Sequence, residues 1–439
     1  MNAPWSAQRY VHAIRQADWR TPLGTVATVR GLAVTVTGLN ASLGDLCSLE
    51  GNLGPVLAEV VGLGQGHITL MPFGRLDGIA TGCSVRSQPE QRDIAVGPAL
   101  LGRVIDAFGQ PLDSQPSPQC DARRALAGAP INPMQRPPVN TVLETGVRAI
   151  DGLLTLGEGQ RVGIFAGSGV GKSTLLGMIA RHATADINVI ALIGERGREV
   201  RDFIERQLGP QGMANTVVVV ATADQPAPAR VRAAYAAVSI AEHFRDQGKR
   251  VLLTMDSITR LAMARREIGL AAGEPPTARG YTPSVFAELP QLCERCGTAA
   301  SGGAITALLT VLVEGDDMNE PVADALRAIL DGHIVLSRAI AERGHYPAID
   351  ILKSASRLMA ELVTPADRAL IRRAVATLSV LERNRQMIDI GAYERGSSAE
   401  IDAALAVQAA LETFLVQHDA GVNRAEAMAQ LRGVLSESR

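Results

Sequence analysis

The chain of 439 residues is too long for one small hydrophobic core, which favours two or three domains. Its 43 basic and 45 acidic residues give a formal charge of −2, which excludes a protein that binds nucleic acid or an anionic membrane through its overall charge. Aromatic residues make up only 3% of the chain, too few for extensive base stacking, and we expect no nucleic-acid partner.

Residues 1–20 predict a short helix or tail, whose charges do not fit the apolar core of a secretory signal. No apolar run approaches the roughly 18–20 residues that span a bilayer. The cysteines are odd in number and scattered along the chain. We therefore expect reduced thiols, a cytoplasmic protein and, at most, a peripheral contact with a membrane.

Residues 21–95 have the pattern of a small β-barrel. In "LAVTVTGL", Val34 and Val36 alternate with Thr35 and Thr37, which is the two-residue period of a half-buried strand. Further short apolar runs are separated by turn signals that combine Gly with Asn or Asp. Short, evenly spaced strands of this kind are typical of a small barrel.

Seven prolines lie between Pro111 and Pro138, both included, and they exclude a regular helix or a central strand. We expect this segment to be an ordered crossing into the next domain. The strand-like runs "RVGIFA", "INVIALIG", "TVVVVAT" and "RVLLTMD" then alternate with helical stretches. This alternation predicts an α/β domain over residues 96–365, with a parallel sheet covered by helices on both faces.

The strand pattern ends near Pro365. Beyond it, Ala404, Val407, Leu411 and Phe414 step by three, four and three residues, which marks one face of an amphipathic helix. The sequence therefore predicts a small helical domain over residues 366–439.

The strongest chemical signal is "AGSGVGKST", which lies between a predicted strand and a predicted helix, as a phosphate-binding loop requires. Its glycines allow backbone N–H groups to point at phosphate oxygens. The ammonium of Lys172 would reach the β- and γ-phosphates, and the hydroxyl of Ser173 would bind Mg²⁺. Ala166 replaces the first glycine of the strict pattern. The expected nucleotide contacts are Gly167, Ser168, Gly169, Val170, Gly171, Lys172, Ser173 and Thr174.

Two acidic residues follow other predicted strands. Asp256 ends "RVLLTMD", and an acid at that edge of a sheet can hold Mg²⁺ through water. Glu195, in "LIGERGREVRDF", is the acid nearest to its strand end and would orient and polarise the attacking water. For this charged segment the alternative is a solvated helix start with local ion pairs, and the spacing alone leaves both open.

Five longer motifs resemble one protein family: "GIFAGSGVGKST", "IGERGREVRDFIE", "TMDSITRLAMARREIGLAAGEPPTARGYTPSVFAELP", "VEGDDMNEPVADALRAILDGHIVLSR" and "GHYPAIDILKSASRL". Together they resemble the ATPases of type III secretion systems over residues 20–420. That family includes the export ATPase of the flagellum and that of the virulence injectisome, and it is related to the catalytic subunits of rotary ATP synthases. The resemblance implies a RecA-like P-loop ATPase core between the barrel and the C-terminal helices, with ATP as substrate and Mg²⁺ as cofactor.

The resemblance also implies roles for single residues. Lys172 would be catalytic as well as phosphate-binding, Glu195 would be the catalytic glutamate, and Arg196 would help to hold the site. Glu199 would lie near the water shell of the metal, and Asp256 would be the strand-end acid that binds it.

Two residues further along the chain take their roles from the resemblance alone. Tyr346, in "GHYPAID", would pack on adenine, where the alternative is a half-buried core tyrosine. Arg357, in "SASRL", would be inserted by one subunit toward the γ-phosphate of its neighbour. The alternative for Arg357 is a surface arginine, paired with Glu361 if the stretch is helical. An arginine supplied by a neighbour requires a ring, and the resemblance implies a homohexamer.

Two further segments have tempting alternatives. "LCERC" contains Cys293 and Cys296, but a zinc site would need two more ligands, and Cys47, Cys83 and Cys120 are single. We expect two free thiols one helical turn apart. The basic segment "RLAMARREIGLAAGEPPTARGY" could bind nucleic acid, whereas the resemblance makes it a helix and loop that face the centre of a ring.

The leading functional interpretation is a motor ATPase of type III protein secretion. It would act in a ring at the cytoplasmic face of the export gate, peripheral to the inner membrane, to release chaperones and unfold substrates. The implied partners are a stator protein, a central stalk protein, chaperone–effector complexes and the membrane protein of the export gate. The alternatives are a flagellar export ATPase, a rotary ATP synthase subunit, a Rho-like RNA translocase and a nucleotide-binding structural subunit.

Overall fold

The computed structural model describes residues 23–88, 92–313, 315, 317–418 and 420–436. The helix or tail predicted over residues 1–20 lies outside the described residues. The chain divides into two compact units. The first comprises the described residues up to Arg92 together with Ile268–Glu274, and the second comprises Asp93–Glu267 and the described residues from Pro275 onward. The boundaries expected at residues 20, 95 and 365 stay predictions.

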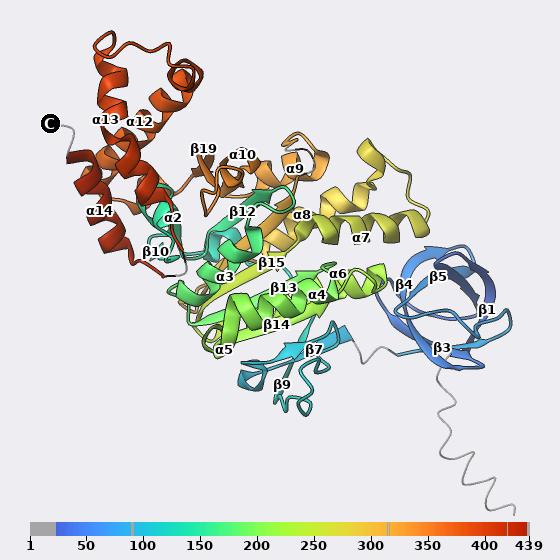
Figure 1. Cartoon of the computed structure of the whole chain (residues 1–439). Helices are drawn as coiled ribbons and strands as arrows, with labels where there is room; N and C mark the ends of the chain where they lie inside the picture. The colour runs from blue at the N-terminus through green and yellow to red at the C-terminus, as the bar shows by residue number, and fades with distance from the viewer. Residues whose placement is uncertain (1–22, 89–91, 314, 316, 419, 437–439) are drawn as a thin grey trace, which may run out of the picture. The chain divides into compact units, whose positions relative to one another are not determined.

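The first unit contains a closed antiparallel barrel, drawn in blue in Figure 1, with the strand order β1-β2-β5-β4-β3-β6. Its strands are Leu23–Arg30 (β1), Ala33–Thr37 (β2), Leu46–Gly51 (β3), Gly54–Gly64 (β4), His67–Pro72 (β5) and Ser84–Ser87 (β6). The predicted alternation in β2 is confirmed, because Val34 and Val36 are fully buried in the barrel core.

The second unit is built on a mixed sheet with the strand order β19-β18-β12-β17-β15-β13-β14-β8, with β16 beside β17. Neighbouring strands from β18 to β8 run parallel, whereas β19 is antiparallel to β18. The strands of this sheet are Val104–Ile105 (β8), Arg161–Ala166 (β12), Ile187–Ile193 (β13), Thr216–Ala221 (β14), Arg250–Asp256 (β15), Gly297–Thr298 (β16), Ala304–Leu312 (β17), Gly332–Leu336 (β18) and Ile349–Ser356 (β19). Smaller pairs join Asp93–Val96 (β7) to Ala122–Ala125 (β9) and Val142–Leu143 (β10) to Leu156–Gly157 (β11).

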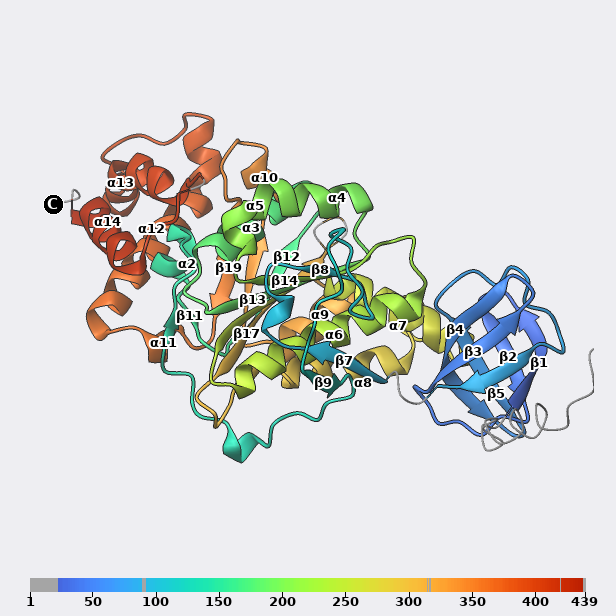
Figure 2. The ribbon, with the colours of Figure 1, turned by 90° about the horizontal axis from the view of Figure 1, so that it is seen from below.

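Helices cover both faces of this sheet, as predicted. Figure 2 shows α3, α4 and α5 on one side and α6 and α8 on the other. The helices between strands are Arg148–Leu153 (α2), Lys172–His182 (α3), Gly197–Asp202 (α4), Gly209–Met213 (α5), Ala227–Asp246 (α6), Ile258–Ala271 (α7), Pro283–Glu294 (α8), Pro321–Ile329 (α9) and Arg338–Ala341 (α10). Shorter turns are the 3₁₀ segments Pro98–Leu100 (η2), Pro133–Gln135 (η3) and Ala278–Gly280 (η5), and the π-helical segment Phe203–Leu208 (η4).

The chain after β19 is helical, as predicted. Its helices are Met359–Leu362 (α11), Pro365–Asp389 (α12), Ala399–Leu415 (α13) and Arg424–Ser436 (α14). Ala404, Val407, Leu411 and Phe414 are all buried, which confirms the predicted apolar face of α13. Both views place α12, α13 and α14 beside α2 (Figures 1 and 2).

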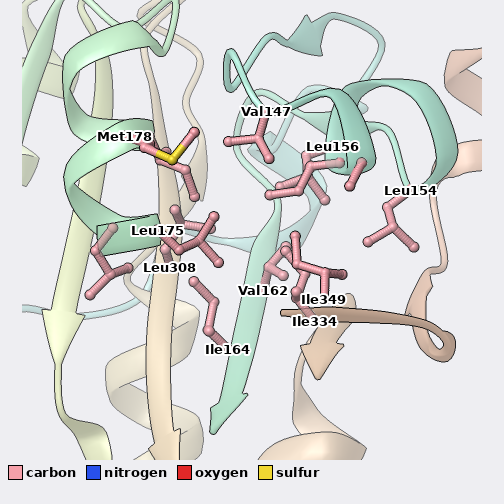
Figure 3. Close-up of a cluster of buried hydrophobic side chains, with 14 of the residues drawn as sticks. Val147, Leu154, Leu156, Val162, Ile164, Leu175, Met178, Leu308, Ile334 and Ile349 are labelled. Atoms are coloured by element: carbon pink, nitrogen blue, oxygen red, sulfur yellow. The ribbon is translucent and has the colours of Figure 1, made fainter. Parts of the chain in front are cut away.

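One continuous hydrophobic core joins the sheet to α3, to α2 and to the C-terminal helices. Figure 3 shows how side chains from segments distant in sequence meet in this core: Val147, Leu154, Leu156, Val162, Ile164, Leu175, Met178, Leu308, Ile334 and Ile349. Strand β12 lies inside this core, and the loop that follows it is therefore held at a fixed edge of the sheet.

Candidate active site

The predicted phosphate loop connects the end of β12 at Ala166 to the start of α3 at Lys172. Gly169 and Gly171 have φ angles of 78° and 86°, a region in which side chains with a Cβ are strained. A Cβ at Gly169 would meet nothing within 4 Å, so conformation rather than space requires glycine there. The loop ends at the N-terminus of α3, where free backbone N–H groups favour a bound anion.

Three charged side chains meet beside this loop. The Nζ atom of Lys172 makes a close ion pair with Asp256 and lies 3.6 Å from Oε1 of Glu195. Asp256, at the end of β15, is only 4% exposed and also accepts a hydrogen bond from the Thr310 hydroxyl at 2.7 Å. These residues come from α3, from the loop after β13 and from β15, and the order of the parallel strands brings them to one edge of the sheet.

The pKa of Glu195 is raised to about 7, chiefly by burial and next by the negative charge of Asp256. The positive charge of Lys172 acts in the opposite direction, while a side-chain hydrogen bond to Glu199 and the charge of Glu199 add to the rise. A carboxyl group that titrates near neutral pH can exchange a proton with water at physiological pH.

The other residues predicted near the phosphates are more exposed. Ser173 and Thr174 are exposed in the first turn of α3. The Arg196 side chain is 83% exposed and its Nη1 atom lies 3.7 Å from Oε1 of Glu199, so the local ion pair weighed as an alternative is present. Arg196 also begins α4, because its carbonyl accepts the N–H groups of Glu199 and Val200.

Tyr346 lies beside the phosphate loop. A Cβ added to Gly171 would be 3.1 Å from Cδ1 of Tyr346, so the aromatic ring occupies the space next to that glycine. The ring remains 39% exposed. An exposed aromatic face beside a phosphate loop can stack on a nucleotide base.

Arg357 lies at the other end of the sheet from its own phosphate loop. The register pairs Ala166 with Leu336, at the loop end of the strands, but pairs Ser356 with Gly332, four residues earlier in β18. Four residues of strand correspond to about 13 Å. The side chain of Arg357 is therefore separated from the Lys172 cluster of its own chain.

The ion pair between Arg357 and Glu361, which was the alternative to a role on a neighbouring subunit, is not formed. Arg357 sits in a turn between β19 and α11, outside any helix, so the helical spacing that the pairing requires does not exist. Its N–H donates to the carbonyl of Asp331, and its guanidinium donates to the carbonyl of Arg327 at 3.0 Å. Among the described residues no carboxylate forms an ion pair with this exposed arginine.

Two side chains of the site carry too weak a signal to be found in sequence. Arg260, on α7, lays its aliphatic part over Gly194, and its buried Nε atom has no hydrogen-bond partner among the described residues. The only sequence feature that could have indicated Arg260 is its position four residues after Asp256, in the helix that follows β15. Thr310 is fully buried in the apolar strand β17, where a hydroxyl needs a partner and finds Asp256.

The "LCERC" segment was considered as a zinc site and the basic segment as a nucleic-acid site. In both, side chains that such a site would use are buried or contact other residues of the chain. Cys293, near the end of α8, and Cys296, just after it, are free and buried, and burial raises the pKa of the Cys296 thiol to about 12. In the basic segment, Arg265 pairs with Glu288, and the guanidinium of Arg266 lies 5.4 Å from the ring centre of Tyr281. These arginines are thus engaged within the protein.

No helix in the described part of the chain is both long and apolar enough to cross a membrane. Within the same residues, no three His, Cys, Asp or Glu side chains are grouped so that they could hold a metal ion by themselves.

Comparison with protein families assigns all three parts of the chain. Residues 26–88 match the ATP synthase alpha/beta family, beta-barrel domain, and residues 146–356 match the nucleotide-binding domain of the same family. Residues 363–433 match the T3SS EscN ATPase C-terminal domain.

Curated proteins and a solved structure resemble nearly the whole chain. The flagellum-specific ATP synthase of Bacillus subtilis (strain 168) is 52% identical over 93% of this chain and 94% of its own length. The type 3 secretion system ATPase of Xanthomonas euvesicatoria is 50% identical over 90% of this chain and 89% of its own. The assembled ATPase EscN of the enteropathogenic E. coli type III secretion system is 43% identical, with a TM-score of 0.89 over 94% of this chain and all of the EscN chain.

Proposed function

This chain belongs to the family of ATPases that contains the type 3 secretion system ATPases and the flagellum-specific ATP synthases, and from that membership we propose that it is the ATP-driven motor of a type III secretion system. It is a P-loop ATPase. The observation that carries the proposal is the cluster of Lys172, Glu195 and Asp256 beside the phosphate loop.

The phosphate loop and Lys172 hold the triphosphate of ATP, because backbone N–H groups and one ammonium neutralise the phosphate oxygens. Glu195 orients the attacking water and accepts its proton, for which a pKa near 7 is suited. Arg196 helps to hold the site from the start of α4, and Arg260, next to Gly194, adds positive charge where the released phosphate would form.

The oxygen donors at this edge of the sheet fit Mg²⁺. The hydroxyl of Ser173 and the carboxylate of Asp256 would bind it, with Glu199 near its water shell. The fit rests on charge: Asp256 raises the pKa of Glu195, so two carboxylates already repel each other beside a single lysine. When bound, Mg²⁺ neutralises charge on the transferred phosphoryl group. Tyr346 packs on the adenine base.

Arg357 acts on a neighbouring subunit. Arg357 lies about 13 Å, measured along the strands, from the end of the sheet that carries the phosphate loop of the same chain. This separation and the exposure of its guanidinium support a role on the neighbouring subunit. An arginine that neutralises the developing charge of phosphoryl transfer contributes about 10³–10⁵ in rate. A closed ring with one such arginine at each interface follows, and we propose a homohexamer.

The partners follow from the same proposal. EscN is known in complex with its central stalk EscO, at a TM-score of 0.86 to this chain, which supports a stalk protein here. A stator protein, chaperone–effector complexes and the membrane protein of the export gate complete the proposed set. The ring acts at the cytoplasmic face of the inner membrane, where it releases chaperones and unfolds substrates.

A second candidate is the flagellar export ATPase. The relative from B. subtilis is 52% identical, against 50% for the secretion ATPase of X. euvesicatoria, and this observation favours the flagellar branch slightly. The neighbouring genes distinguish the two branches, since needle-complex genes would support the injectisome and flagellar structural genes the alternative.

Purified protein tests the enzymatic part of the proposal. We expect ATP hydrolysis, and we expect Glu195→Gln to lower kcat by about 10²–10⁴ while ATP still binds. The matched control is Glu205→Gln, because Glu205 is an exposed acid two residues after the charged segment of Glu195 and pairs with Arg201 instead. A rate that rises severalfold with single-stranded RNA would contradict the proposal and favour an RNA translocase.

A further inference from the structure

Gln417 lies two residues beyond the end of α13, and both polar atoms of its buried side-chain amide form hydrogen bonds. It is only 6% exposed. Its Nε2 atom donates to the carbonyls of Gly146 and Ala420, each at 2.7 Å, and its Oε1 atom accepts the N–H of Arg148 at 2.7 Å. A buried side chain held at both ends in this way has one position.

The backbone of the same residue reaches the candidate nucleotide site. The N–H of Gln417 donates to the carbonyl of Tyr346 at 2.9 Å, and the ring of Tyr346 lies next to Gly171 of the phosphate loop. A short path of contacts therefore joins Gly146, Gln417, Tyr346 and Gly171. All four residues belong to the second unit.

The C-terminal helices meet at this same point. The guanidinium of Arg148 donates to the carbonyl of Val416 and, at 3.1 Å, to Oε1 of Gln430 on α14. The guanidinium also lies 5.7 Å from the ring centre of Phe414 on α13. A shift of the end of α13 relative to α2 would break the bonds of Gln417 to Gly146 and Arg148 and displace Gln417, and Tyr346 would lose its backbone anchor.

We propose that Gln417 is a positioning residue that fixes Tyr346 for the base of the nucleotide and thereby makes the affinity for that base depend on the C-terminal helices. The inference rests on the proposed function, in which Tyr346 packs on adenine. It adds that the affinity for the base depends on a residue that holds the backbone of Tyr346 and does not itself touch the nucleotide.

The test compares ATP with inorganic tripolyphosphate, which has the phosphates but no base. Gln417→Met keeps the length of the side chain and removes its hydrogen bonds. We expect the KM for ATP to rise about tenfold, the scale of one base–aromatic contact, with kcat unchanged within about twofold. The inhibition constant of tripolyphosphate should stay the same. The matched control is Gln430→Met, the same substitution at a glutamine that accepts a hydrogen bond from the Arg148 guanidinium instead of the Arg148 backbone N–H. Gln430 has no hydrogen bond to Gly146 or to the Tyr346 segment, so this variant should leave both constants unchanged.

Three results would overturn the inference: an unchanged KM for ATP in Gln417→Met, an equal loss for ATP and tripolyphosphate, or an equal effect of Gln430→Met. A wild-type chain that neither binds nor hydrolyses ATP would instead overturn the proposed function. If Gln417→Met does not fold, hydrogen exchange on the wild-type protein decides. ATP, but not tripolyphosphate, should slow exchange of the Gln417 amide, and equal protection by both would contradict the inference.

Discussion

Glu195 has its pKa raised to about 7 by burial and by the charge of Asp256, and this has a consequence for the pH dependence of the enzyme. A glutamate that must accept a proton from water is inactive when it is protonated, so activity is lost as the pH falls through this pKa. We therefore expect kcat/KM for ATP to rise with pH through a midpoint near 7. A pH–rate profile of the purified protein measures it.

Glu199 supplies the internal check on this assignment, since its charge and its hydrogen bond both raise the pKa of Glu195. Glu199→Gln should move the midpoint of the profile to lower pH, toward the ordinary range of glutamate. Glu205→Gln, on the neighbouring turn, should leave the midpoint in place. A midpoint that ignored Glu199 would mean that another group controls the profile.

Among single residues, the sequence predicts those functional groups that lie at or just after the ends of recognisable strands. Lys172 and Glu195 come shortly after strands and Asp256 ends one, and the ends of neighbouring parallel strands meet at one edge of the sheet. Arg260 and Thr310 could not be predicted, because their roles depend on packing across strands: a contact with Gly194 in one case and a hydrogen bond to Asp256 in the other.

Among the elements, the long apolar strands and the loop between β12 and α3 follow directly from the sequence. The predicted strand "RVGIFA" coincides with Arg161–Ala166. Strands as short as Val104–Ile105 and Gly297–Thr298 escape prediction, since two residues have no period to detect and form strands only beside a neighbour.

Phe414 of helix α13 packs closely against α2, and this contact predicts an effect on stability. Phe414 is 2% exposed, and its Cζ atom would lie 2.9 Å from a Cβ placed on Gly152. Phe414→Ala should leave a cavity there and cost about 3–5 kcal/mol. The measurement is the midpoint of thermal unfolding, which should fall by several degrees.

Glu412→Ala is the control for this element, because Glu412 lies on the exposed side of the same helix. Its cost should be within about 0.5 kcal/mol. If the two variants unfolded at the same temperature, α13 would not depend on its contact with α2.

At the scale of the whole molecule, the antiparallel strand β19 runs between Tyr346 at one end of the sheet and Arg357 at the other. Tyr346 precedes β19 at the end of the sheet that carries the phosphate loop, and Arg357 follows it at the opposite end. One strand thus connects Tyr346, which we propose to contact the chain's own nucleotide, with Arg357, which we propose to act on a neighbouring subunit. The sequence alone could not place Arg357, because separation across the sheet is set by the register of β18 and β19.

The central claim is that one subunit completes the active site of the next, and mixing two inactive variants tests it most directly. Arg357→Ala should bind ATP but lose about 10³–10⁵ in turnover, because it lacks the arginine that stabilises the transition state. Glu195→Ala should be inactive for a different reason. In rings assembled from equal amounts of both, about a quarter of the interfaces pair an intact Glu195 with an intact Arg357, and a corresponding part of the ATPase activity should return. Rings shown to contain both variants that recover no activity would contradict the account.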